Sequence, residues 1–303
     1  MSRAQAPSTD DSGLAGLASK INDLPLLPQV LVKLMQLDPA SDHYFDEFET
    51  LAKEDPSFAV RVIALANSAA SAPAVPIMSL ADALARMGTA CINTLVAALS
   101  VQQVFVPTSP AQTLLWKHAI TTAVGAQKIA EMLPRLQVTP CHAYLVGLLH
   151  DIGRFVMLEH APAKLLEVDE ANWQTPDDLV GADTEVFKFT HCELGFLACA
   201  HWGLPDQVAQ IVRAHHMAPP HPIEPGSFEA SNFCVQVADR LSVTVIDHAE
   251  FDTMDAAERA SRVETHCLKT DEDRALLPVD VLCGQIDRIS DERKRLLDGL
   301  GFR

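Results

Sequence analysis

Residues 144–153 of the chain read Tyr144-Leu145-Val146-Gly147-Leu148-Leu149-His150-Asp151-Ile152-Gly153. The first six of these residues form an apolar segment that is typical of a helix in a protein core. The polar pair His150 and Asp151 ends that segment. Because buried polar groups need hydrogen-bond partners or a cation, this pair indicates a polar site inside a helical protein.

Two polar residues in other apolar segments are candidates to meet this pair. Asp239 ends the segment 233–239, where a buried carboxylate needs a partner or a cation. His118 is followed along its predicted helix by small residues, which permit close helix contact: Ala119, Ala123, Gly125 and Ala126. Two imidazoles and two carboxylates converging inside a bundle are a ligand set suited to Mn, Fe, Zn or Mg. Alternatively, the same side chains form a polar core by hydrogen-bonding across helices.

The remaining chain is predicted to be helical almost throughout. Apolar residues recur at the helical period of 3.6, and strand-like alternation is nearly absent. A proline-punctuated joint at 106–110 separates two lobes. We therefore expect an all-α fold with a disordered tail at 1–19, an N-terminal helical bundle at 20–106, a second helical lobe at 110–245 packed on it, and a C-terminal helical extension at 246–303.

Helix boundaries follow from capping residues, prolines and the apolar pattern. In the first lobe, Ser79 with Asp82 three residues later is a capping-box arrangement that opens a helix, which Gly88 ends. In the second lobe we expect helices near 112–133, 140–150, 152–160, 178–189, 192–201, 206–216 and 229–244. In the C-terminal extension we expect helices at 250–265 and 280–300.

The composition excludes some kinds of partner. The formal net charge is −17, and such an acidic surface repels both nucleic-acid phosphates and anionic membranes. The uncharged segment 87–106 is long enough to span a bilayer, but polar residues interrupt it, so we expect a buried helix there. We therefore expect neither a nucleic acid nor a membrane as partner.

The cysteines and the N-terminus bear on the cellular compartment. The seven cysteines include no Cys-X-X-Cys pair, so neither a disulfide framework nor a thiolate zinc site is indicated. Cys192 and Cys199 lie seven residues apart on one predicted helix and are expected to pack in the core. Residues 1–13 are polar and lack the apolar run of a signal peptide. We expect a reduced, cytoplasmic chain.

The order of these polar residues resembles the HD superfamily, in which a helix histidine precedes a His-Asp pair and a distant aspartate. The resemblance narrows to the HDOD family of HD-related output domains through His191-Cys192-Glu193-Leu194-Gly195, Trp202-Gly203-Leu204-Pro205 and His215-His216. The first lobe is also similar to that family, in Leu24-Pro25-Leu26-Leu27-Pro28, Glu54-Asp55-Pro56 and Leu65-Ala66-Asn67-Ser68-Ala69. The resemblance covers about residues 20–245 and implies that the second lobe is HD-like.

The resemblance also implies roles for individual residues. A first divalent metal would be held by His118, His150, Asp151 and Asp239. A second would be held by His191 with His215 or His216, bridged by Asp151. If the chain is an enzyme, Asp151 and Arg154 are the expected catalytic residues, because Arg154 stands where related hydrolases often carry a phosphate-contacting lysine. The family also resembles the HD-GYP hydrolases, which cleave cyclic di-GMP and carry a Gly-Tyr-Pro triplet. No such triplet follows the pair His215-His216 in this chain, which argues against cleavage of cyclic di-GMP.

Two functions remain open. The resemblance implies a regulatory protein of bacterial signalling that binds a ligand or other signalling proteins rather than turning over a substrate. A homodimer through the C-terminal helices is a further expectation. The alternative is a metal-dependent HD-class phosphohydrolase acting on a nucleotide or another phosphoester, in which the metals polarise a phosphoryl oxygen and activate a water.

Overall fold

The computed structural model describes residues 14, 16, 33, 34, 37, 41–52, 62, 77–88, 105–171, 173–248 and 250–299. The described residues form helices and no strand, which confirms the predicted all-α fold. Of the predicted tail at 1–19, only Leu14 and Gly16 are described, and both are helical. Most of the predicted bundle at 20–106 lies outside the described residues, including the three motifs quoted from it.

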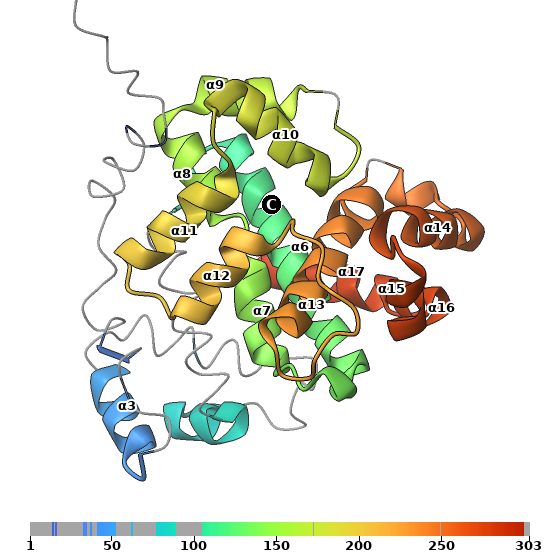
Figure 1. The fold of residues 1–303 in the computed structure, drawn as a ribbon. Helices are drawn as coiled ribbons and strands as arrows, with labels where there is room; N and C mark the ends of the chain where they lie inside the picture. The colour runs from blue at the N-terminus through green and yellow to red at the C-terminus, as the bar shows by residue number, and fades with distance from the viewer. Residues whose placement is uncertain are drawn as a thin grey trace, which may run out of the picture.

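The described part of the first lobe has a small core of its own. It contains α3 (Tyr44–Ala52) and a helix at 80–88 (Figure 1). The hydroxyl of Ser79 accepts a hydrogen bond from the Asp82 amide at 3.0 Å, which confirms the predicted helix start. Gly88 ends that helix with a φ of +72°, in the left-handed region that glycine adopts readily. The buried core residues are Leu34, Tyr44, Phe48, Ala52, Val62, Leu80, Ala83 and Leu84.

The second lobe and the C-terminal part follow in chain order (Figure 1). The lobe comprises α6 (Pro110–Met132), η1 (Pro134–Leu136), α7 (Pro140–Leu149), α8 (Ile152–His160), α9 (Pro162–Asp169), α10 (Pro176–Phe187), α11 (His191–His201), α12 (Asp206–Ala214), α13 (Phe228–Leu241) and the π-helical turn η2 (Ser242–Ile246). The C-terminal part comprises η3 (Phe251–Thr253), α14 (Ala256–Arg262), the π-helical turn η4 (Val263–Cys267), α15 (Asp271–Leu276), α16 (Val279–Cys283) and α17 (Ile286–Gly299).

Local sequence explains where many of these helices begin. Proline occupies the first helical position of α6, α7, α9 and α10, where its missing N–H costs nothing. Ser109 and Thr190 cap α6 and α11, and each forms a capping box with the residue three positions later. These caps fix the start of α11 at His191, so that a histidine occupies its first turn.

Helix α6 lies at the centre of the lobe and packs against α7, α13 and α17 (Figure 1). A methyl group added to Gly147 of α7 would lie 2.9 Å from the Cα of Ala123 on α6. One added to Gly125 of α6 would lie 3.0 Å from the Cβ of Ala238 on α13. The predicted close contacts at small residues of α6 are therefore confirmed, and they draw α6, α7 and α13 together.

Helices α8 and α11 make the closest backbone approach of this kind. A Cβ at Gly153 of α8 would lie only 1.9 Å from the carbonyl oxygen of His191 on α11. The facing residue on α11 is Gly195, whose added Cβ would lie 3.1 Å from the Gly153 amide nitrogen. Glycine at position 153 thus allows His191 to stand beside Asp151, two residues before Gly153.

The C-terminal helices share the hydrophobic core of the second lobe. Ile286, Ile289 and Leu297 of α17 are buried in the same cluster as the core residues of α6. Lys128 of α6 forms an ion pair of 3.2 Å with Glu292 of α17, and both side chains are buried. The C-terminal part therefore completes the core of the lobe.

Three sequence-based details are wrong. Helix α9 was not expected, because only Leu165 and Val168 of its eight residues are buried, too few to give a clear helical period. The two long helices expected at 250–265 and 280–300 are broken, the first at Met254 and Asp255 between η3 and α14, and the second at Gly284 after α16. Cys141 is disulfide-bonded, so the expectation of a chain without disulfides is wrong there.

Among the described residues, none of the helices combines the length and apolarity that a bilayer crossing requires. Cys192, Cys199, Cys234, Cys267 and Cys283 are free thiols.

The contact at Gly153 predicts the effect of two glycine substitutions. Gly153→Ala places a methyl group against backbone and should destabilise the protein by about 1–3 kcal/mol or more. Gly181→Ala, at an exposed position of α10 with open space around it, should be neutral or stabilising by up to about 1 kcal/mol. Urea unfolding of both variants measures the difference. Equal midpoints would contradict the described contact.

Candidate metal centre

Four side chains meet in what we term the first group: His118 of α6, His150 after α7, Asp151 before α8 and Asp239 of α13. The Nε2 atom of His118 lies 3.2 Å from Nε2 of His150, 3.5 Å from Oδ2 of Asp151 and 3.3 Å from Oδ1 of Asp239. The Nε2 atom of His150 lies 3.7 Å from each of these two carboxylate oxygens. The structure thus brings together the four residues that the sequence singled out.

The second group contains three histidines and shares Asp151 with the first. His191 opens α11, and His215 and His216 directly follow α12. The Nε2 atom of His191 lies 3.2 Å from Nε2 of His215 and 3.1 Å from Nε2 of His216. It also lies 3.2 Å from Oδ1 of Asp151, whose other oxygen faces the first group. Both His215 and His216 take part, whereas the resemblance left open which of them would.

The outward-facing nitrogens of three imidazoles are held by acceptors. Nδ1 of His150 donates to the Gly147 carbonyl, and Nδ1 of His215 donates to the Val212 carbonyl, each at 2.7 Å. Nδ1 of His191 donates to Oδ2 of Asp183 at 2.5 Å. Because these oxygens can only accept, each Nδ1 carries the proton. In the neutral rings, Nε2 therefore presents a lone pair to the centre.

The other two histidines are held in the same orientation. Nδ1 of His118 donates to the Ser242 hydroxyl at 2.9 Å, because that hydroxyl in turn donates to Asp247. Asp247 is paired with Arg293 of α17. Nδ1 of His216 lies 3.3 Å from Oδ1 of Asp177, which also binds Arg240 and Lys269. All five histidines thus direct Nε2 inward.

This arrangement fits a pair of cations. Two neutral rings whose lone pairs face each other at 3.1–3.2 Å cannot share a hydrogen bond, and an ion between them removes the repulsion. Ligands bound at about 2.0–2.2 Å from one ion lie about 2.8–3.6 Å apart in octahedral or tetrahedral geometry. The measured separations in the two groups are 3.1–3.7 Å. Each group could therefore hold a metal ion.

Without a metal, protons balance the charge of the buried carboxylates. Burial would raise the pKa of Asp151, but His150, His191, His215 and Arg154 hold it well below its ordinary value. Burial would lower the pKa of His215, but the nearby Cys192 and Asp151 raise it to about 10. Since Nδ1 is already protonated, the additional proton sits on Nε2. A proton and a metal ion thus compete for the same atom.

The centre opens onto a cavity of about 470 Å³. Its walls are mostly apolar and include Leu115, Leu165 and Leu179, with Trp173 beside them. Arg154, the residue expected to contact phosphate, lines this cavity, and its Nη2 donates to Asp169 at 2.5 Å. The positive charge of Arg154 is therefore already paired with a carboxylate.

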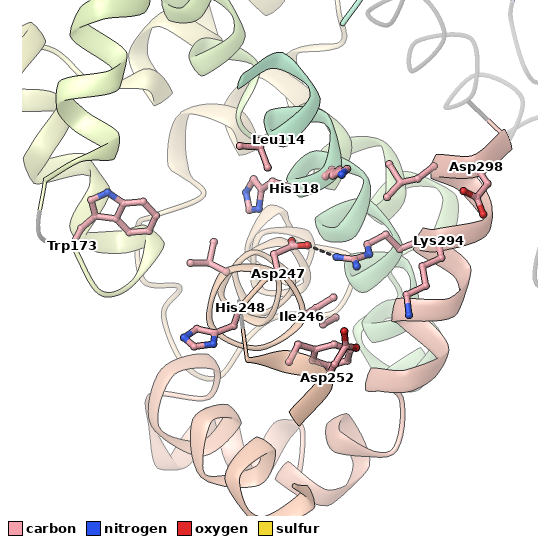
Figure 2. Close-up of a pocket in the computed structure, with 14 residues that line it drawn as sticks. Leu114, His118, Trp173, Ile246, Asp247, His248, Asp252, Lys294 and Asp298 are labelled. Atoms are coloured by element: carbon pink, nitrogen blue, oxygen red, sulfur yellow. Dashed lines mark hydrogen bonds and ion pairs between the residues drawn. The ribbon is translucent and has the colours of Figure 1, made fainter. Parts of the chain in front are cut away.

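A neighbouring cavity of about 820 Å³ shares four lining residues with the first: Leu114, His118, Trp173 and Val243. Figure 2 shows His118 and Trp173 at this cavity, with Asp247 and Lys294 also on its wall. His118 thus lies where the two cavities meet the first group.

Comparison with known proteins identifies the family. The family model of the HDOD domain matches residues 24–218. The chain belongs to the HDOD domain family. A curated relative, an uncharacterized protein of Treponema pallidum (strain Nichols), is 26% identical over 212 residues, which are 69% of this chain. The match covers 41% of that protein, so the chain spans less than half the length of the relative.

Solved structures show the same HDOD fold. A predicted phosphohydrolase from Shewanella amazonensis SB2B has a TM-score of 0.68 and 21% identity, covering 93% of this chain and 97% of that chain. An HDOD domain protein of unknown function from Geobacter sulfurreducens has a TM-score of 0.65 and 23% identity, and the match covers 94% of this chain and 98% of that chain. A predicted signal transduction protein from Marinobacter aquaeolei VT8 has a TM-score of 0.67 and 22% identity, and the match covers 99% of this chain and 62% of that chain. At these identities the likeness shows the fold.

The HDOD structure also contains site residues that the sequence did not indicate. Asp183 is fully buried and accepts hydrogen bonds from both the amide and the ring of His191. A signal for it exists, since Asp183 lies four residues from each of the apolar residues Leu179 and Phe187 on the buried face of α10. Ser242 and Asp177, which hold His118 and His216, have no comparable signal.

The raised pKa of His215 predicts pH-dependent metal binding. A proton must leave Nε2 before a metal binds, so affinity should rise with pH between pH 6 and 9, below the His215 pKa of about 10. The metal affinity should increase about tenfold per pH unit for each proton that the metal displaces. Calorimetric titration in two buffers of different ionisation enthalpy counts the protons released. An affinity independent of pH would contradict this competition.

The contact of Asp183 with His191 predicts a positioning role. Asp183→Ala should weaken metal binding about 10- to 100-fold, because His191 loses the acceptor that orients its ring. Asp183→Asn keeps an acceptor oxygen and should recover part of this loss. Asp178→Ala is the control, since Asp178 caps the same helix without contacting a histidine of the centre and should cost stability only. A chelator competition assay gives the affinities, and identical values for Asp183→Ala and Asp178→Ala would refute the role.

Proposed function

We propose that this chain is a regulatory protein of bacterial signal transduction whose histidine–aspartate centre binds a pair of divalent metal ions. The main evidence for the metal site is the inward orientation of five Nε2 atoms. In each ring, a hydrogen bond between Nδ1 and an acceptor oxygen fixes this orientation. Membership of the HDOD family and the fold shared with the predicted signal transduction protein from Marinobacter aquaeolei support the regulatory role.

The residues of the two groups would hold the ions. The first would be held by His118, His150, Asp151 and Asp239, and the second by His191, His215 and His216 with Asp151 as the bridge. Because imidazoles outnumber carboxylates, the set suits Fe or Zn better than Mg. When bound, such ions polarise a phosphoryl oxygen and lower the pKa of a bound water.

Binding rather than turnover is supported by the walls of the cavity. They are largely apolar, and Arg154, the single Lys or Arg among the described lining residues, is paired with Asp169. Among the described residues that line this cavity, a phosphate would therefore meet no unpaired Lys or Arg side chain. We propose other signalling proteins as partners.

Self-association through the C-terminal helices is a further part of the proposal. Because the apolar face of α17 is already buried in the core, the surface would come from helices α14 to α16. Val281 of α16 is 41% exposed and lies on that part of the chain.

A phosphohydrolase is the second candidate, and one observation favours it. His118, Asp151, His216 and Asp239 all line the 470 Å³ cavity, so the centre is open to a molecule bound there. In this role Arg154 would turn from Asp169 to orient a phosphoryl oxygen, and Asp151 would stay ionised because its pKa is held well below the ordinary value. One Shewanella amazonensis structure of this fold is named as a predicted metal-dependent phosphohydrolase.

Metal analysis together with a phosphoester screen tests the proposal. Protein purified after expression with added Mn and Fe should carry about two ions per chain, and His150→Ala should lose most of them. His43→Ala, at an exposed position of the first lobe, should keep them. Nucleotides and simple phosphoesters should not be hydrolysed steadily by the loaded protein.

The results of these two measurements distinguish the regulatory protein from the phosphohydrolase. A metal-free wild-type protein would contradict the metal centre. Sustained hydrolysis that is lost in His150→Ala and kept in His43→Ala would replace the regulatory role with the hydrolase.

A further inference from the structure

We infer that Cys192 supplies a thiolate ligand to the second group, so that the two halves of the centre prefer different metal ions. This inference rests on the metal centre of the proposed function. It concerns a residue whose place in the sequence indicates only packing in the core.

The position of Cys192 carries the inference. It is the second residue of α11, directly after His191, and its side chain is 5% exposed. Its Sγ atom lies 3.5 Å from Nε2 of His191 and 3.9 Å from Nδ1 of His215. One ligand atom from each of Cys192, His191, His215 and His216 can be chosen so that all four lie within 4.8 Å of one another. The thiol therefore belongs to the same cluster as the three imidazoles.

The spacing is that of two ligands on one ion. A metal bound at about 2.3 Å from sulfur and 2.0–2.1 Å from nitrogen separates these atoms by about 3.6 Å in tetrahedral geometry. The measured 3.5 Å between Sγ and Nε2 of His191 matches this separation. The longer contact with His215 involves Nδ1, which already donates to the Val212 carbonyl.

A hydrogen bond between the Cys192 thiol and His191 explains fewer of the short contacts than a shared metal ion does. Nε2 of His191 also lies within 3.1–3.2 Å of His215, His216 and Asp151. A single hydrogen bond between Cys192 and His191 joins only two of these atoms, whereas an ion among them can bind several of them at once.

Cys199 shows what a packing cysteine of the same helix looks like. It lies seven residues after Cys192 and is fully buried in the main hydrophobic core cluster. Cys192 is buried to a similar degree, but it is not part of that cluster, and its polar contacts are the two imidazoles. Cys199 is therefore a matched control for Cys192.

The two groups differ in chemical softness as a consequence. The first group offers two imidazoles and two carboxylates, while the second offers three imidazoles and a thiolate and shares one carboxylate. Thiolates favour Zn²⁺ and other softer ions, and carboxylates favour harder ions such as Mn²⁺. The second group should therefore retain Zn²⁺ or Co²⁺ against Mn²⁺, and the first should be less selective.

Cobalt substitution tests the thiolate directly. The 303-residue chain is freed of metal and titrated with Co²⁺, and its absorption spectrum is recorded. A thiolate ligand gives a sulfur-to-cobalt charge-transfer band in the near ultraviolet, in addition to the visible bands of any Co²⁺ site. The band should appear in the wild type and in Cys199→Ser. It should be absent in Cys192→Ser and Cys192→Ala, which should bind the second Co²⁺ at least tenfold more weakly.

The outcomes distinguish the inference from the proposed function. No Co²⁺ binding by folded wild-type protein would overturn the metal centre and the inference with it. Two bound Co²⁺ ions with visible bands but no charge-transfer band would overturn the inference alone. A band that persists in Cys192→Ser would do the same. Thermal unfolding of the metal-free Cys192 and Cys199 variants shows that the compared proteins are folded.

Discussion

The approach of α8 to α11 at Gly153 is the constraint on which the centre depends. The backbones meet so closely that a side chain at this position has no room. The contact sets His191 against Asp151, and Asp151 in turn faces both groups through its two oxygens. His215 also lies 3.7 Å from Oδ1 of Asp151, so two histidines of the second group adjoin the shared carboxylate.

The buried charges impose a second constraint on the whole lobe. Burying an imidazole or carboxylate is costly unless every polar atom has a partner. The partners come from elements outside the two groups: carbonyls at the ends of α7 and α12, Asp183 and Asp177 of α10, and Ser242 of η2. The helices around the centre are thus held in position by the acceptors that they provide as well as by apolar packing.

The fold and part of the centre could be predicted from the chain. His118, His150, Asp151 and Asp239 stand in or directly after apolar helical segments, where a polar residue is conspicuous. Helix starts were readable where capping residues and proline occur together, as at Ser109 and Thr190. The hydrogen-bond acceptors of the histidines could not be predicted, because they depend on which helices lie side by side. Nothing in the local sequence tells that Asp177 reaches His216, 39 residues away.

The chain of contacts from His118 through Ser242 and Asp247 ends at Arg293, on the last described helix. Each link is a hydrogen bond or an ion pair, so a rotation or displacement of α17 changes the acceptor that orients the His118 ring. The outer surface of the protein and its innermost nitrogen atoms are therefore mechanically connected. The orientation of the His118 ring therefore depends on the position of α17.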